Sequence, residues 1–121
     1  MTIAIHSYKD LIVWQRATEL VVAIYKVTSH FPESEQFGLT SQMRRASVSI
    51  ASNIAEGRYR STRKDFLKFV RTAYASGAEL ETQIFIAKQL PETSALQYEI
   101  VDDLLLQTMK MLNNFIQQLK S

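Results

Sequence analysis

Cysteine is absent from this sequence, and glycine and proline are rare. The 121 residues contain no Cys, three Gly and two Pro. Without Cys, the chain has no disulfide, no thiolate nucleophile and no Cys-based zinc site. The scarcity of Gly and Pro, together with 46% hydrophobic residues, argues against intrinsic disorder. The length fits one domain over residues 1–121, with a single buried core.

Long apolar runs are missing as well. No stretch approaches the roughly 20 consecutive apolar residues that a membrane span needs. The N-terminus lacks the basic and then apolar pattern of a secretory signal. We therefore expect a cytoplasmic protein with no membrane partner.

The patterns of common catalytic and metal sites are also missing. The two histidines, His6 and His30, have no carboxylate at ligand spacing, and the Glu-x-x-His repeat of di-iron bundles does not occur. There is no glycine-rich phosphate loop and no G-x-S-x-G elbow. Glu79 and Glu81 are two residues apart on a predicted helix, so they point in different directions and form no acid–base pair. We expect no metal site, no cofactor and no catalytic residue.

What remains is a strongly helical pattern. Pro32, Gly57 and Pro91 divide the chain into four segments of about 30 residues each, as residues that end helices do. Each segment has apolar residues at the three- and four-residue spacing of one helical face, whereas strand-like alternation is confined to residues 3–5. The predicted fold is all-α: an antiparallel up-down-up-down four-helix bundle with helices at about 8–29, 37–56, 62–90 and 94–120.

Helix ends and small residues refine this prediction. Three pairs at capping-box spacing predict helix starts: Ser7 with Asp10, Thr62 with Asp65, and Ser94 with Gln97. Gly57 occupies the place of a left-handed C-terminal cap. The second segment is rich in Ala and Ser, which indicates close packing on a neighbouring helix. An antiparallel turn at residues 57–61 would place residues 46–49 opposite residues 72–73, with Gly77 as another site of close approach.

The fourth segment is apolar on more than one face. Its main seam comprises Val101, Leu104, Thr108, Met111, Leu112, Phe115 and Leu119. Leu105, Leu106 and Met109 lie off that seam. A bundle helix needs only one apolar stripe, so the extra surface favours self-association, and the alternative is a wide core-facing stripe.

The net charge of +2 is unevenly distributed. Residues 44–71 hold eight basic and two acidic residues, for a net charge of +6, and the rest of the chain carries −4. Cations near Tyr59 are suited to contacting phosphates while the ring stacks on a base, and the alternative is a solvated helix face. The candidate nucleic-acid-binding residues are Arg58, Arg60, Arg63, Lys64, Lys68 and Arg71.

Arg44 and Arg45 lie among small and apolar residues, so we expect one of them to face inward or across an interface. A partly buried Arg needs a carboxylate or several carbonyl partners. The candidate carboxylates are Glu56, Glu79 and Glu81. Ligand contact is the alternative for the two arginines, and hydrogen bonding to the turn or to the start of the third helix is the alternative for Glu56. The structural or interface polar set is Arg44, Arg45, Asn53, Glu56, Glu79 and Glu81.

Specific strings in the chain resemble those of a known family. They occur in order between residues 7 and 90, and they are 11–17 (LIVWQRA), 31–33 (FPE), 37–46 (FGLTSQMRRA), 49–57 (SIASNIAEG) and 79–83 (ELETQ). Through these strings the sequence resembles the four-helix-bundle proteins named for intervening sequences in bacterial 23S ribosomal RNA genes. The accessory variability determinant of diversity-generating retroelements is related to that family. The last helix resembles the family only in length and apolar character.

The resemblance implies a small cytoplasmic bacterial four-helix bundle that assembles as a homopentameric ring. No enzymatic activity is established for the family, and its retroelement relatives act through nucleic acid and a reverse transcriptase. We therefore expect a non-enzymatic homo-oligomer that binds RNA or DNA through residues 58–71. The alternatives are a scaffold for a protein partner and an enzyme that holds an anionic small molecule near Arg44, Arg45 and Glu56.

Overall fold

The computed structural model describes residues 8–120, and all regular structure in that range is helical. The four α-helices are α1 (Ile12–Thr28), α2 (Leu39–Arg58), α3 (Arg63–Gln89) and α4 (Glu99–Lys120). Two short 3₁₀ helices, η1 (Tyr8–Asp10) and η2 (Glu33–Glu35), precede α1 and α2. No strand occurs in the described range, so the all-α prediction is confirmed at that level.

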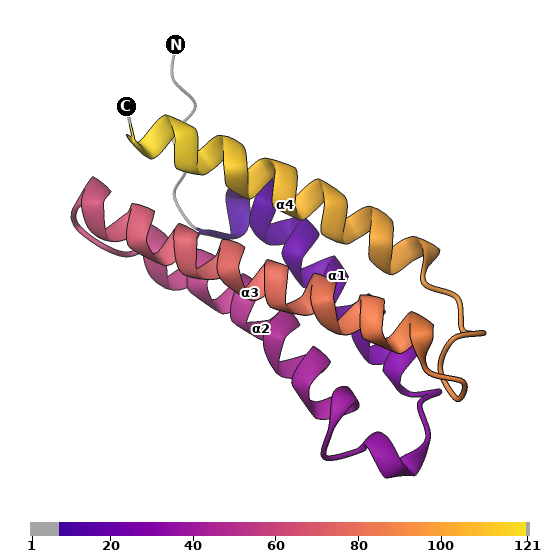
Figure 1. The fold of residues 1–121 in the computed structure, drawn as a ribbon. Helices are drawn as coiled ribbons and strands as arrows, with labels where there is room; N and C mark the ends of the chain where they lie inside the picture. The colour runs from indigo at the N-terminus through magenta and orange to yellow at the C-terminus, as the bar shows by residue number, and fades with distance from the viewer. Residues whose placement is uncertain (1–7, 121) are drawn as a thin grey trace.

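The four helices lie side by side (Figure 1). Each packs on two neighbours, in the cyclic order α1, α2, α3 and α4, and the α2–α3 contact is the most extensive. The α2–α3 turn lies at one end of the molecule, and the α1–α2 and α3–α4 connections lie at the other (Figure 1). The α3–α4 connection brings the adjoining helix ends together: Lys88 at the end of α3 binds Asp102 at the start of α4, with 2.6 Å between Nζ and Oδ2.

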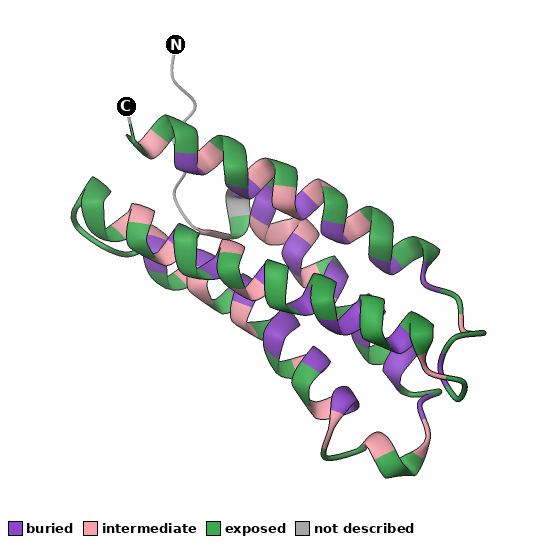
Figure 2. Cartoon of the chain, viewed as in Figure 1, coloured by how far each residue is buried: buried purple, intermediate pink, exposed green. Residues whose placement is uncertain are grey.

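The core fills the space between the helices. Figure 2 shows the buried residues on the sides of the helices that face one another. The largest fully buried apolar side chains come from all four helices and are Leu20, Ile24, Met43, Ile50, Ile54, Val70, Leu80 and Leu112. Burial of each such side chain contributes about 1.5–3 kcal/mol, so the core is the main source of stability.

The buried seam of α4 differs from the predicted one. Its buried residues are Val101, Leu105, Thr108, Leu112 and Ile116. Leu105, expected off the seam, therefore belongs to it, and Met109 is partly buried against the core. The physical reason is that α4 packs on both α1 and α3, which widens its core-facing stripe. Of the residues predicted to be off the seam, Leu106 alone remains exposed.

The observed helix starts show which of the predicted capping residues do cap a helix. Thr62 caps α3, because its hydroxyl accepts a hydrogen bond from the Asp65 amide at 3.1 Å. Ser94 and Gln97 do not cap α4, which begins five residues later than predicted, at Glu99. The intervening turn is held by the Thr93 hydroxyl, which donates to the Ala87 carbonyl at 2.6 Å. The predicted cap at Ser7 lies outside the described residues.

The remaining boundaries differ by smaller amounts. α1 begins after η1 rather than at residue 8, and α2 begins at Leu39 rather than at residue 37. At the start of α2 the Glu35 carboxylate accepts a hydrogen bond from the Leu39 amide at 3.0 Å. This anion at a helix N-terminus satisfies a backbone donor that has no partner within the helix.

The predicted left-handed cap at Gly57 is wrong. Gly57 lies inside α2, and no glycine in the described range has a positive φ. Its role is close packing: a Cβ at this position would lie 2.8 Å from the Phe69 Cβ and 3.0 Å from the Phe66 Cδ1. Gly77 packs closely as predicted, because a Cβ there would overlap the Met109 Sδ.

The register of α2 against α3 also differs from the predicted one. The Ser49 and Ser76 hydroxyl oxygens lie 2.8 Å apart, whereas residues 72–73 were expected opposite Ser49. The shift arises because α2 continues through Gly57 to Arg58, so the turn to α3 falls later in the chain. Small residues face one another across this pair as expected.

The two buried glycines should respond differently to alanine. We expect Gly57→Ala to lower the free energy of unfolding by about 1–2 kcal/mol, because overpacking against Phe69 outweighs the roughly 1 kcal/mol that Ala gains over Gly in a helix. Gly77→Ala should stay within about 1 kcal/mol of the wild type, because the flexible Met109 side chain can move aside. Denaturant unfolding of both variants measures the difference, and equal losses would contradict the assignment.

Tyr98 gives the fold a dependence on high pH. Burial raises the pKa of its hydroxyl above the ordinary value of 10.0, and the hydroxyl donates to the Thr93 carbonyl at 2.8 Å. The unfolded chain therefore loses the Tyr98 proton first, so this contribution is fully present below about pH 10 and is lost as the pH rises further.

Replacement of Tyr98 tests this contribution. Tyr98→Phe should lower the free energy of unfolding by about 1 kcal/mol at neutral pH, because the Thr93 carbonyl loses the Tyr98 hydroxyl and keeps only the longer hydrogen bond from the Leu96 amide at 3.4 Å. The difference in the free energy of unfolding between variant and wild type should narrow as the pH rises from about 9 to about 11. Urea unfolding of both proteins across this pH range measures that difference. A difference that stays constant would show that Tyr98 does not titrate as described.

Candidate nucleic-acid interface

The basic segment occupies one end of the molecule. Residues 58–71 run from the last residue of α2, through the turn, into the first third of α3. This end is the left side of Figure 1, where α2 joins α3. The six predicted cations thus come from one turn and one helix start, and they divide into two groups of three.

The first group has structural partners. Arg60 lies over the Phe69 ring, 4.5 Å from its centroid, and its Nη2 is 3.8 Å from a carboxylate oxygen of Glu56. Arg63 donates to the last turn of α4, from Nη2 to the Gln118 carbonyl at 2.7 Å and from Nε to the Leu119 carbonyl at 3.2 Å. A cation at a helix C-terminus satisfies free carbonyls and is favoured by the helix dipole. Arg58 is partly buried and also interacts with its surroundings.

The second group consists of Lys64, Lys68 and Arg71, which we call the cationic face. The spacing of four and three residues places them on one side of α3. All three are exposed, and within residues 8–120 none of their side chains forms a hydrogen bond or an ion pair. Their charges are therefore fully available to a partner outside the chain.

An aromatic cluster lies at the same turn. The Tyr59 side chain is exposed and contacts Tyr8 edge-on, with 5.6 Å between ring centroids. Tyr8 in turn packs on Trp14 at 5.2 Å. The sequence indicates Tyr59 as a stacking residue, but the contact with Tyr8 depends on where η1 lies in the fold. The cluster fixes an exposed ring beside the cations.

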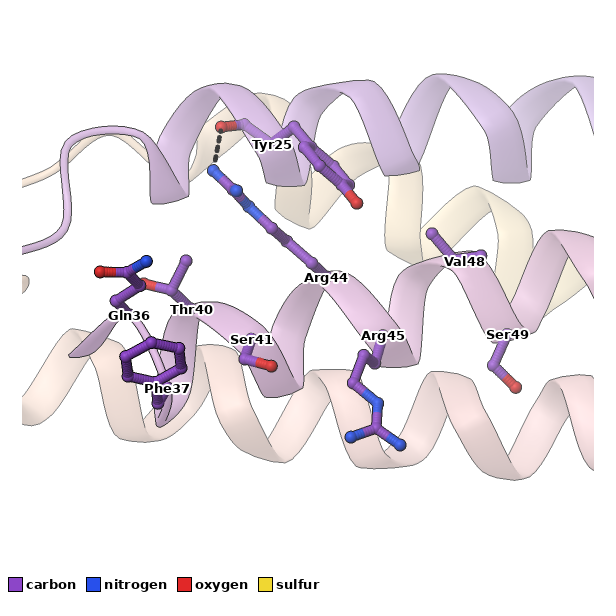
Figure 3. A pocket seen from close by; sticks show the side chains of 9 residues that line it. All are labelled: Tyr25, Gln36, Phe37, Thr40, Ser41, Arg44, Arg45, Val48 and Ser49. Atoms are coloured by element: carbon purple, nitrogen blue, oxygen red, sulfur yellow. Dashed lines mark hydrogen bonds between the residues drawn. The ribbon is translucent and has the colours of Figure 1, made fainter.

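Arg44 and Arg45 lie elsewhere, near the start of α2 (Figure 3). The Arg44 Nε donates to the Thr28 hydroxyl at 2.9 Å, and its guanidinium lies over the Tyr25 ring at 4.4 Å. Its Nη2 also reaches the Tyr25 carbonyl at 3.5 Å. Arg44 thus binds the end of α1 through a hydroxyl, a carbonyl and a ring. These three groups take the place of a carboxylate partner. Arg45 is exposed and has no hydrogen bond or ion pair within residues 8–120.

The remaining polar candidates are spread over two helices. Glu56 pairs with Arg60, its neighbour four residues on, rather than with Arg44 or Arg45. The Asn53 Nδ2 donates to the Ser49 carbonyl at 2.8 Å within α2. Glu79 accepts a hydrogen bond from the buried Gln83 at 3.3 Å, whereas Glu81 is exposed and has no partner in the described range. Of the predicted polar set, Arg45 and Glu79 line one small pocket between α2 and α3, and the others are not brought together into one site.

Residues 8–120 lack two further features. No cluster of three or more side chains of the types that bind metals occurs there. None of the helices in that range has the length and apolar character needed to cross a membrane.

Comparison with known proteins places the chain in a family. No curated protein matches it. A crystal structure of a protein of unknown function from the S23 ribosomal protein family, from Bacteroides thetaiotaomicron VPI-5482, has the same fold with a TM-score of 0.71. The two sequences are 24% identical, and the match covers 86% of this chain and 97% of that one. The family model for the 23S rRNA-intervening sequence protein matches residues 9–114. The chain therefore belongs to the 23S rRNA-intervening sequence protein family.

Proposed function

We propose that this protein is a non-enzymatic, self-associating helical bundle that binds RNA or another nucleic acid. The observation that carries the proposal is the cationic face: Lys64, Lys68 and Arg71 are exposed on one side of α3 and have no partner in the described chain. Cations that already stabilise the fold, such as Arg63, contribute less to a ligand because binding would disrupt their own contacts.

Phosphate binding is the interaction that suits these three side chains. Each Lys or Arg that neutralises a phosphate releases a condensed counterion, and this release supplies most of the affinity of non-specific binding. Tyr59 lies at the same end, with 72% of its surface exposed, and offers a ring on which an unpaired base can stack. The resemblance to the nucleic-acid-dependent retroelement proteins supports the same ligand class.

Assembly is the second part of the proposal. The connections at alternating ends support an up-down-up-down bundle, and the family resemblance supports a homopentameric ring in the cytoplasm. Exposed apolar side chains support self-association, because water contact with large apolar groups costs about 25 cal/mol per Å². A ring would repeat the cationic face in every copy, and the fields of the copies would add.

Charge reversal tests the nucleic-acid part. Lys64→Glu combined with Lys68→Glu should weaken binding to a structured RNA by roughly tenfold or more at about 50 mM salt, and should lower the salt slope by about two counterions. Fluorescence anisotropy across a salt series measures both quantities. Lys26→Glu combined with Lys110→Glu is the matched control, because it makes the same charge change at exposed sites away from the cationic face.

Two results would overturn this assignment. Equal weakening in both double variants would show a response to net charge alone. Absence of wild-type binding at about 50 mM salt, where phosphate contacts are strong, would favour a protein partner instead.

Light scattering tests the assembly part. The wild type should elute at a mass that is a multiple of 13.9 kDa, with five copies expected. A species of one copy at micromolar concentration would refute self-association, whatever the result with RNA.

A further inference from the structure

A groove at the far end of the molecule from the cationic face is not used by the proposed nucleic-acid site. It lies along α1 and the start of α2 and has a volume of about 670 Å³. Figure 3 shows the residues that line it, among them Tyr25, Phe37, Arg44, Arg45 and Val48. We call it the Phe37 groove.

The Phe37 groove exposes large apolar side chains. Phe37 is 90% exposed and Val48 is 40% exposed. A Phe ring held almost wholly in water, beside other apolar groups, is typical of a surface that binds another protein. The chain itself, in the described range, provides no cover for it.

The charge of the groove restricts what can cover it. Its lining includes two cations, Arg44 and Arg45, and no acidic residue. Two copies that met groove to groove around a twofold axis would bring these arginines together, which is unfavourable. Arg45 has no hydrogen bond or ion pair in the described chain, although it lines a second pocket together with Glu79, so its charge can pair with an acidic side chain of another copy.

A complementary surface exists on α3. Ala78, Glu81, Thr82 and Phe85 are separated by three and four residues, so they share one side of the helix. All four are exposed, Phe85 is 65% exposed, and Glu81 has no partner in the described chain. We call this side the Phe85 face. It offers an apolar ring and an unpaired carboxylate, where the groove offers apolar side chains and an unpaired arginine.

The two surfaces also lie at the same level along the bundle. The Ser49–Ser76 contact at 2.8 Å fixes the register of α2 against α3. Arg45 and Glu79 line a second pocket between these helices, so Arg45 is level with the residues around Glu81. Copies related by rotation about an axis along the bundle keep their levels. Such a rotation can therefore join the groove of one copy to the Phe85 face of the next without a shift along the bundle.

We propose that the Phe37 groove binds the Phe85 face of a second copy of this chain, with Arg45 paired to Glu81 and Phe85 packed against Phe37 and Val48. The inference rests on the proposed self-association and identifies its surfaces. Because two different patches meet, the contact is heterologous, and repetition closes a ring when the rotation allows it. The cationic face at the other end of α3 stays open to a ligand.

A charge swap tests the pairing. Arg45→Glu alone and Glu81→Arg alone should each raise the dissociation constant of the assembly by roughly tenfold or more, because each places like charges in contact. The double variant should recover most of the lost affinity, since it restores opposite charges. Phe37→Ser should weaken assembly by a similar factor without unfolding the chain, because the ring is already exposed and anchors of this type dominate interfaces. Ile100→Ser is the matched control, an exposed apolar residue outside both surfaces.

Sedimentation velocity over a concentration series measures the assembly, and circular dichroism checks the fold. A monomeric wild type would overturn both the self-association and this interface. An oligomeric wild type that Phe37→Ser leaves unchanged would overturn the interface alone. Loss of assembly with Phe37→Ser but no recovery in the double variant would overturn the Arg45–Glu81 pairing and the docking on α3.

Discussion

The close approach of α2 and α3 is the constraint on which the rest of the structure depends. Gly57 lets the α2 backbone come so near to α3 that a single added carbon would meet the Phe69 Cβ. Along the same interface the Ser49 and Ser76 hydroxyls are in contact. This packing sets the register of the two helices, and the register decides which residues lie at each level of the bundle. The positions of the turn, the cationic face and the Phe37 groove follow from it.

The division of the cations follows from that geometry. Arg60 and Arg63 extend from the turn toward Phe69 and the end of α4, where a ring and free carbonyls bind them. The cationic face points away from every other helix, so its three charges remain unpaired. Partnered cations hold the end of the bundle together, and unpaired ones create the field that an anionic ligand would meet. Both the fold and the proposed recognition thus draw on one short basic segment.

The two ends of α3 have different characters for the same reason. Near the turn its outer side carries positive charge, and toward its C-terminus it becomes apolar with one unpaired acid. Ligand binding and self-association would therefore occupy separate lengths of one helix. Such a separation lets a ring form without covering the basic end, so assembly would concentrate positive charge rather than bury it.

The sequence by itself determined the four α-helices within residues 8–120, because three- and four-residue spacing and the scarcity of Gly and Pro are local properties of the chain. The Thr62 cap depends only on residues close to it in the sequence, and the charge of the basic segment could be counted from the sequence.

The tertiary structure decided which residues distant in the sequence come into contact. Gly57 resembled a helix end in the sequence, yet proximity to Phe69 makes it a packing residue inside α2. The candidate carboxylate partners for Arg44 or Arg45 were Glu56, Glu79 and Glu81, yet the end of α1 supplies Arg44 with a hydroxyl and a carbonyl. Which three of the six candidate cations in residues 58–71 remain free could not be read from the chain, because partners such as the Leu119 carbonyl lie more than fifty residues away. Local spacing specifies helices, whereas register and partnership arise only when the helices pack.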